Sequence, residues 1–133
     1  MTNRASGTFD VELKPQPSYA NGANAVGRMS IDKQFHGDLE ATSVGEMLAV
    51  GTSVEGSAGY VAMEQVSGTL NGRTGTFALQ HSATMNRGAQ QLNIAVVPDS
   101  GTGQLISLAG RLMILIDDGK HSYDFEYTLP ESI

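Results

Sequence analysis

A carboxylate and an imidazole fall on matching positions of two sequence segments that flank a tight turn. Asn71–Gly72 is a strong signal for a two-residue β-hairpin turn. Counting back from that turn sets His81 opposite Ala62, and it sets Glu64 opposite Leu79. Glu64 and His81 are then diagonal neighbours on one sheet face. Diagonal neighbours lie about 7–8 Å apart at Cα, a gap that two long side chains can bridge.

The face that carries this pair is predicted to be the interior of the fold, because its other members are Ala62, Val66, Phe77 and Leu79. Lys33 also lies between apolar neighbours, Ile31 and Phe35. Lysine is rarely fully buried unless it is paired. Glu64 is therefore the candidate partner of Lys33, on the condition that their strands bring the two residues together inside the protein.

Two interpretations of this cluster stand side by side. A carboxylate in apolar surroundings has its pKa raised by desolvation and lowered by a nearby cation, and such groups often mark functional sites. Glu64 and His81 would then act as a catalytic acid–base pair. Alternatively, they form a buried hydrogen-bonded pair that fixes strand register without catalysis. We favour the structural interpretation.

Other site chemistry finds little support in the residues. The chain has no cysteine, which excludes disulfides, thiolate nucleophiles and cysteine-based metal sites. A metal would need the three histidines, His36, His81 and His121, together with carboxylates. No two of these histidines have the i, i+2 spacing that places two ligands on one face of a strand. We expect neither a metal nor a cofactor.

Alternation of apolar and polar residues predicts eight strands, and no long amphipathic helix is indicated. Residues 15–24 are expected to form a loop, Gly45 is expected to form a bulge, and a short turn or helical stretch is expected to end at Leu108. The predicted strands cover residues 8–14, 26–35, 39–50, 60–70, 74–85, 91–97, 111–117 and 120–129.

Eight sequential strands without a covering helix favour a sandwich or a closed barrel. The short turns favour a meander, and eight strands suffice to close one. We predict an all-β fold, a closed eight-stranded antiparallel meander barrel, as a single domain spanning residues 1–133.

Two further turns predict cross-strand pairs. The Asp118–Gly119 turn sets branched residues opposite aromatic ones: Ile116 opposite His121, Ile114 opposite Tyr123, and Leu112 opposite Phe125. The Gly37–Asp38 turn, taken as a two-residue turn, sets Lys33 opposite Thr42 and Ile31 opposite Val44.

Composition limits the partners. A net charge of −6 and a pI near 4.8 disfavour nucleic-acid binding. No apolar run reaches the roughly 20 residues of a membrane-spanning helix, and the first residues lack the apolar core of a secretory signal. We therefore expect a cytoplasmic protein.

Segments 47–50, 94–97 and 112–116 are apolar on both faces, which predicts burial against another subunit in a homo-oligomer.

Residues 27–43, 59–64, 68–81, 85–88, 97–103 and 120–127 resemble a bacterial family of small uncharacterised proteins. The run that ends in Leu79–Gln80–His81 is the most specific part of this resemblance. The resemblance implies a calycin-like barrel similar to that of allene oxide cyclases, which are often oligomeric. Those enzymes hold a reactive fatty-acid epoxide in an apolar barrel cavity, but no motif here carries over their catalytic residues.

Three functions follow as alternatives. The first is binding of a small, partly apolar molecule inside the barrel, at a ligand site formed by Lys33, Tyr60, Glu64, Phe77, His81 and Tyr123. The second is an isomerase or cyclase that uses Glu64 and His81 for proton transfer. The third is a structural or interaction protein whose barrel is filled by Phe9, Phe35, Phe77 and Phe125.

Overall fold

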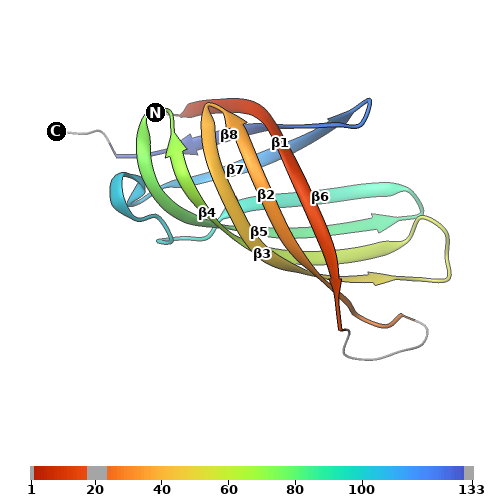
Figure 1. The fold of residues 1–133 in the computed structure, drawn as a ribbon. Coiled ribbons are helices and arrows are strands. Elements are labelled where there is room, and N and C mark those ends of the chain that lie inside the picture. Colours follow the sequence, from red (N-terminus) through yellow and green to blue (C-terminus); the bar gives the residue numbers. More distant parts are fainter. Residues whose placement is uncertain (1, 18–23, 131–133) are drawn as a thin grey trace.

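The chain forms a closed antiparallel barrel in which each strand pairs with the next and the last pairs with the first (Figure 1). The computed structural model describes residues 2–17 and 24–130. The predicted eight-stranded meander barrel is confirmed. Its strands are β1 (Asn3–Gln16), β2 (Gly27–Gly37), β3 (Leu39–Gly51), β4 (Ala58–Leu70), β5 (Arg73–Asn86), β6 (Ala89–Val96), β7 (Ala109–Asp117) and β8 (Lys120–Thr128), with one short 3₁₀ helix, η1 (Gly103–Leu105).

The strands agree with the alternation in the sequence, and several extend beyond their predicted ends. β1 continues through Gln16, so the predicted loop begins later than expected, and residues 18–23 of that loop lie outside the described residues. The described chain contains no helix long and apolar enough to cross a membrane.

The two hairpins predicted with glycine turns are confirmed. Ala62 lies opposite His81 and Glu64 lies opposite Leu79 in the β4–β5 ladder. In the β7–β8 ladder, Ile114 lies opposite Tyr123. Asn71 and Asp118 have positive φ angles of 46° and 51°, and the glycine after each is also positive, as a type I′ turn requires.

The register predicted across Gly37–Asp38 is wrong by one residue, because Lys33 lies opposite Ser43 and Ile31 lies opposite Gly45. Asp38 is bonded to neighbouring strands. Its N–H donates to the Ser6 carbonyl at 3.1 Å, and its carboxylate accepts from the Ser6 N–H at 3.0 Å. These tertiary bonds, which the local sequence does not show, set the turn length.

The shift decides which residues of β3 face the interior, since a one-residue slip exchanges the two faces of a strand. Ser43 is 1% exposed, whereas Val44, predicted to lie opposite the buried Ile31, is 59% exposed. Ser43 therefore enters the barrel and Thr42 and Val44 lie outside.

Gly45 does not form the expected bulge, because the ladder runs through it without interruption, from Ile31 to Gly45 and on to Glu64. A Cβ atom built on Gly45 would lie 2.0 Å from the Met63 carbonyl oxygen. Glycine at this position allows β3 to approach β4 closely. The residue type is therefore explained by packing between the two strands and not by an extra residue in a bulge.

One half of the barrel is tightly filled. The connection between β6 and β7 folds back with η1 and inserts Leu105 and Leu108, both 1% exposed or less. These leucines belong to the same core cluster as an aromatic group made of Phe9, Phe35, Phe77, Tyr123, Phe125 and Tyr127. This end, which we call the closed half, lies at the left of Figure 1.

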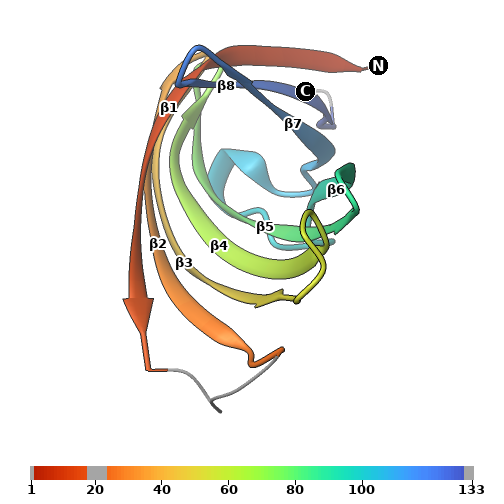
Figure 2. The ribbon, with the colours of Figure 1, turned by 90° about the vertical axis from the view of Figure 1, so that its right-hand side faces the viewer.

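At the other end the strands diverge. β6 pairs with β7 at a single position, Ala95 opposite Arg111, although β5 and β6 form eight pairs, from Leu79–Val96 to Asn86–Ala89. Figure 2 views the molecule from this end and shows the curved wall of β1 to β6, with the β7–β8 hairpin turned away. We call this end the open half.

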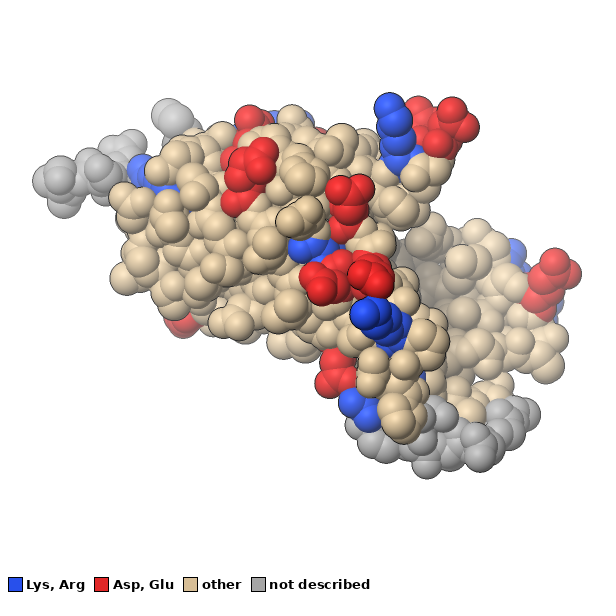
Figure 3. Space-filling model, in the orientation of Figure 1, with Lys and Arg blue, Asp and Glu red and all other residues tan. Residues whose placement is uncertain are grey.

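Apolar side chains also lie on the outside. Met113 and Leu115 of β7 are 59% and 56% exposed, which agrees with the apolar segment noted in the sequence. Figure 3 shows charged groups scattered over one face, with much uncharged surface between them. Burial of the outer residues against another subunit stays a prediction.

Replacing Gly45 with alanine is expected to destabilise the barrel by about 1–3 kcal/mol, the range of overpacked substitutions, because the new Cβ meets the β4 backbone. Gly51→Ala is the matched control, since it lies on the same strand and its Cβ would meet nothing within 4 Å. Urea unfolding of the two variants measures the difference. Equal unfolding free energies would contradict the close-approach explanation.

Candidate functional site

A buried ionic cluster centred on Glu64 occupies the barrel interior. Glu64 Oε2 accepts from Lys33 Nζ at 2.8 Å and from His81 Nε2 at 2.5 Å, and Oε1 accepts from the Ser43 hydroxyl at 2.7 Å. The exposed fractions of Lys33, Glu64 and His81 are 6%, 2% and 4%. The predicted pairing of Glu64 with both Lys33 and His81 is therefore confirmed.

Four consecutive strands each supply one member of this cluster: β2 carries Lys33, β3 carries Ser43, β4 carries Glu64 and β5 carries His81. Lys33 must reach across β3 to meet Glu64. The residue of β3 directly opposite Glu64 is Gly45, which has no side chain to obstruct that contact. The same glycine that brings the two strands together thus leaves room for the ion pair.

The charge of Glu64 is set by its partners. Burial alone raises the pKa of this carboxyl, but the hydrogen bond from His81 and the charge of Lys33 outweigh burial and lower the pKa to about 2. Glu64 is consequently ionised at neutral pH and only accepts hydrogen bonds. The shared hydrogen with His81 therefore belongs to Nε2 of the imidazole.

Aromatic rings support the cation of this cluster. Lys33 Nζ lies 5.2 Å from the centre of the Phe9 ring and 5.7 Å from that of Phe35, within the range of cation–π attraction. Phe9 and Phe35 also contact each other, with 5.6 Å between ring centres. The ammonium group of Lys33 thus contacts the carboxylate of Glu64 and the rings of Phe9 and Phe35.

Tyr60 extends the cluster towards the open half. Its ring centre lies 6.5 Å from that of His81. Burial and the nearby charge of Glu64 both raise the pKa of the Tyr60 hydroxyl, so this group stays protonated at neutral pH. Tyr60 lies on the inner face of β4, since it precedes the buried residues Ala62 and Glu64 at alternate positions.

A cavity of about 310 Å³ lies next to Tyr60, and we call it the inner hollow. By register, most of its lining is on the inward side of β3 to β6. Its lining contains no charged residue: Met47, Ala49, Val50, Gly51, Ala58, Gly59, Tyr60, Ala83, Thr84, Met85 and Gln90.

A second cavity of about 420 Å³, the seam hollow, lies where β6 and β7 diverge and is lined by Gln90, Leu92, Leu112, Met113, Ile114 and Ile116. Figure 3 shows the notch between the β7–β8 hairpin and the neighbouring strands.

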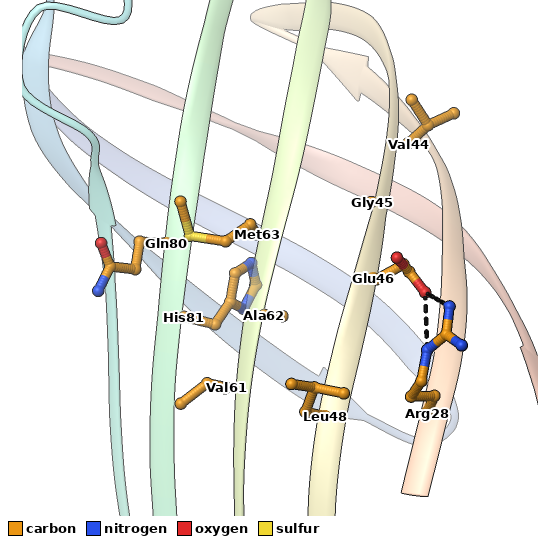
Figure 4. A pocket seen from close by; sticks show the side chains of 10 residues that line it. All are labelled: Arg28, Val44, Gly45, Glu46, Leu48, Val61, Ala62, Met63, Gln80 and His81. Atoms are coloured by element: carbon orange, nitrogen blue, oxygen red, sulfur yellow. Dashed lines mark hydrogen bonds and ion pairs between the residues drawn. The ribbon is translucent and has the colours of Figure 1, made fainter. Parts of the chain in front are cut away.

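A third cavity, of about 750 Å³, lies mainly on the outside of the barrel, and we call it the outer groove (Figure 4). Outward residues of β3 and β4 line it, among them Leu48, Val61 and Met63. The ion pair of Arg28 with Glu46, 2.6 Å long, borders it. Gly45 and Ala62 lie between outward residues of β3 and β4 and also line the groove, as do Gln80 and His81 of β5.

The structure brings together four of the six predicted ligand-site residues: Lys33, Tyr60, Glu64 and His81. The other two lie in the closed half. Phe77 stacks on Phe125 with 6.0 Å between ring centres, and the Tyr123 hydroxyl accepts from the Leu39 N–H at 2.9 Å and donates to the His36 carbonyl at 2.9 Å.

Sequence reasoning missed Ser43. The alternation of Leu39 and Ala41 continues to this residue and would have predicted that it faces inward, had the turn before it been assigned with one more residue. Within the described residues, no group of three or more His, Asp and Glu side chains is arranged to hold a metal ion.

Residues 5–127 match the family described as protein of unknown function DUF3224. The chain belongs to the DUF3224 family. It is similar to a DUF3224 protein of unknown function from Shewanella oneidensis MR-1, whose crystal structure superposes with a TM-score of 0.94. The two are 47% identical, over 99% of this chain and 100% of that one. The resemblance to an uncharacterised bacterial family is thereby confirmed. A search of curated proteins finds no match.

In this DUF3224 barrel, the cluster provides a buried ion pair, Lys33 with Glu64, next to an imidazole and a phenol. Glu64 fixes the ring of His81 through Nε2, which is how a carboxylate orients an imidazole for hydrogen bonding or proton transfer at its other nitrogen. The geometry is thus suited to holding the polar end of a molecule whose remainder lies against the apolar wall.

The stability of this DUF3224 protein is expected to fall as the pH falls from about 4.5 to 2, because Glu64 has a lower pKa folded than unfolded. Above pH 4.5 the carboxylate is ionised in both states and its contribution is complete. Below pH 2 it is protonated in both and the contribution is lost. The shift corresponds to about 3 kcal/mol.

Glu64→Gln removes this titration and serves as the reference. Urea unfolding across this pH range measures the free energy of unfolding of both proteins. The wild type is expected to exceed Glu64→Gln by the largest amount near neutral pH, and the difference is expected to decrease as the pH falls. A difference that stays constant from pH 6 to pH 3 would show that Glu64 is not held in its ionised form.

Proposed function

We propose that this DUF3224 protein binds a small, partly apolar molecule on the inner face of the open half of its barrel. The observation that carries the proposal is the position of a buried, hydrogen-bonded polar cluster beside an uncharged hollow. Apolar walls with a few convergent polar groups are typical of small-molecule sites. The likeness to allene oxide cyclases, which also use an apolar barrel cavity, is part of this proposal.

The positions of large and small side chains inside the barrel support a binding function over a purely structural one. The four phenylalanines expected to fill a structural barrel, Phe9, Phe35, Phe77 and Phe125, are all at most 5% exposed and belong to the core cluster that continues into the closed half. Beyond the ionic cluster, the inner positions next to Tyr60 are small, namely Ala49 and Ala83. The hollow of about 310 Å³ lies there, at the lower end of the size range of ligand sites.

Ala83→Leu is expected to reduce ligand binding at least tenfold, because the larger side chain occupies the inner hollow. Native mass spectrometry of the purified protein, followed by a thermal-shift panel of metabolites and lipids, identifies a ligand, and calorimetry compares the variants. Ser82→Leu is the matched control. It is the neighbouring residue on β5, faces outward, and should leave affinity unchanged.

The proposal fails if the protein carries no copurified molecule and no compound of the panel shifts its melting temperature. It also fails if Ala83→Leu and Ser82→Leu bind the ligand equally well, since the molecule then lies elsewhere.

A second candidate is an isomerase or cyclase, favoured by the contact of 2.5 Å between Glu64 and His81. In this reading, His81 moves a proton at Nδ1 while Glu64 and Lys33 hold the ring. Positioned acid–base groups contribute about 10²–10⁴-fold to a rate.

Once a turned-over compound is known, His81→Asn is expected to lower kcat at least 100-fold, and Glu64→Gln should lower it through loss of ring orientation. Circular dichroism and thermal melting check that both variants fold. Turnover that survives both substitutions would eliminate proton transfer by this pair and leave binding as the function.

A further inference from the structure

Three large apolar side chains on the inner face of the barrel are exposed to solvent where β6 and β7 diverge. Met85, Leu92 and Ile116 are 38%, 37% and 67% exposed. Met85 and Leu92 share a face with the buried Ala83, because Met85 follows it by two positions and Leu92 lies opposite it. Ile116 shares a face with the buried Tyr123, which lies opposite the residue two positions before it. Exposed apolar surface on a concave face is typical of a ligand-binding groove.

The inner hollow and the seam hollow adjoin each other on this face. Tyr60 lies opposite Ala83 in the β4–β5 ladder, and Ala83 lies opposite Leu92 in the β5–β6 ladder. Ala83 lines the inner hollow, Leu92 lines the seam hollow, and Gln90 lines both. Neighbouring strands lie about 4.8 Å apart, so Tyr60 and Leu92 are separated by about 10 Å across the sheet. The two hollows therefore form one trough, which runs from Tyr60 across β5 and β6 to Ile116 of β7.

The two ends of the trough differ in polarity. The Tyr60 hydroxyl, at the inner end, has no hydrogen-bond partner among the described residues. It is accessible, because no sealed side-chain nitrogen or oxygen of the described chain lacks a partner. At the other end, five of the six residues that line the seam hollow are apolar, and the sixth is Gln90. A ligand with one polar group is thus best placed with that group beside Tyr60 and its apolar part over the seam.

The trough offers no partner to a charged ligand. Neither hollow has a charged residue in its lining. The charge of Lys33 is already balanced by Glu64 at 2.8 Å, and its ammonium group also contacts the rings of Phe9 and Phe35. A carboxylate or an ammonium group placed in the trough would lose its hydration without gaining an ionic partner, which is strongly unfavourable. An uncharged polar group needs only the Tyr60 hydroxyl, which is able to donate and to accept a hydrogen bond.

Resting on the proposed function, we infer that the ligand is an uncharged, extended aliphatic molecule that occupies both hollows. Its polar group forms a hydrogen bond with the Tyr60 hydroxyl in the inner hollow. Its aliphatic chain crosses the small residue Ala83 and covers Leu92 and Ile116 at the seam. Met85, beside this path, has a flexible side chain that adapts to the chain of the ligand.

Calorimetry at pH 7.5 with 1-decanol, decanoate and decyltrimethylammonium tests the charge of the ligand, because these probes have similar chains and differ in the head group. We expect 1-decanol to bind at least about tenfold more tightly than either ion. A fourth probe, 1-hexanol, tests the length. Each CH₂ group removed from water strengthens binding about three- to fourfold, so 1-decanol is expected to bind at least about thirtyfold more tightly than 1-hexanol.

Ile116→Ser is expected to weaken 1-decanol binding about fivefold or more and to leave 1-hexanol binding unchanged, because Ile116 lines only the seam end of the trough. Leu115→Ser is the matched control. Leu115 is the neighbouring residue on β7, is 56% exposed and lies on the outer face, so its replacement should change neither affinity. Thermal melting checks that both variants fold.

Tyr60→Phe is expected to weaken the binding of both alcohols about five- to tenfold, because one hydrogen bond is lost. Tyr127→Phe is the matched control, since the same hydroxyl is removed in the closed half, where it accepts a bond from Asn71. Its affinity for both alcohols should equal that of the wild type.

The inference is overturned if either ion binds as tightly as 1-decanol, or if Ile116→Ser and Leu115→Ser bind 1-decanol equally well. An unchanged affinity for 1-decanol in Tyr60→Phe also overturns it. If none of the probes binds but another compound binds in a manner sensitive to Ala83→Leu, the inference fails and the proposed function stands. If no compound binds at all, both fail.

Discussion

An ionised carboxylate inside a β-barrel is the constraint on which the rest of this structure depends. Moving such a charge out of water costs several kcal/mol unless donors replace the lost hydration. Glu64 obtains those donors from Lys33, Ser43 and His81, which lie on three other strands. The requirement fixes the mutual register of β2 to β5, because a shift of one residue in any of them turns its donor outward.

The two halves of the barrel differ in how they are packed. In the closed half, the aromatic rings and the leucines of the β6–β7 connection belong to one core cluster and are at most 5% exposed. In the open half, small residues and methionines replace the aromatic rings, and cavities remain. The ionic cluster lies between the two halves: Phe9 and Phe35 contact its lysine, and Tyr60, next to the inner hollow, contacts its histidine.

Much of this arrangement was predictable where the determining information is local. The Asn71–Gly72 turn and strict alternation sufficed to place Glu64 beside His81. The rarity of unpaired buried lysine made Glu64 a candidate partner for Lys33, and the structure contains that ion pair. These predictions required only turn geometry and the chemistry of single residues.

The remaining features depend on contacts between distant segments. The turn at Asp38 is set by bonds to Ser6, so its length could not be read from its own sequence, and the inward position of Ser43 was lost with it. The prediction of a bulge at Gly45 was wrong. A glycine inside a strand is typical both of a bulge and of a close approach between two strands, so the residue type alone does not distinguish them. Hollows arise from how far strands diverge, which alternation does not encode.

The single pairing between β6 and β7 has a consequence for the rate at which molecules exchange with the interior. In a barrel with complete ladders, lateral passage requires the rupture of several backbone hydrogen bonds, and exchange is then limited by local unfolding. Here β6 and β7 pair only at Ala95 and Arg111 among the described residues, and the seam hollow lies beside Leu92 and Ile116. Widening this seam therefore breaks fewer backbone hydrogen bonds than opening any other pair of neighbouring strands, so the barrel wall opens there with the least local unfolding.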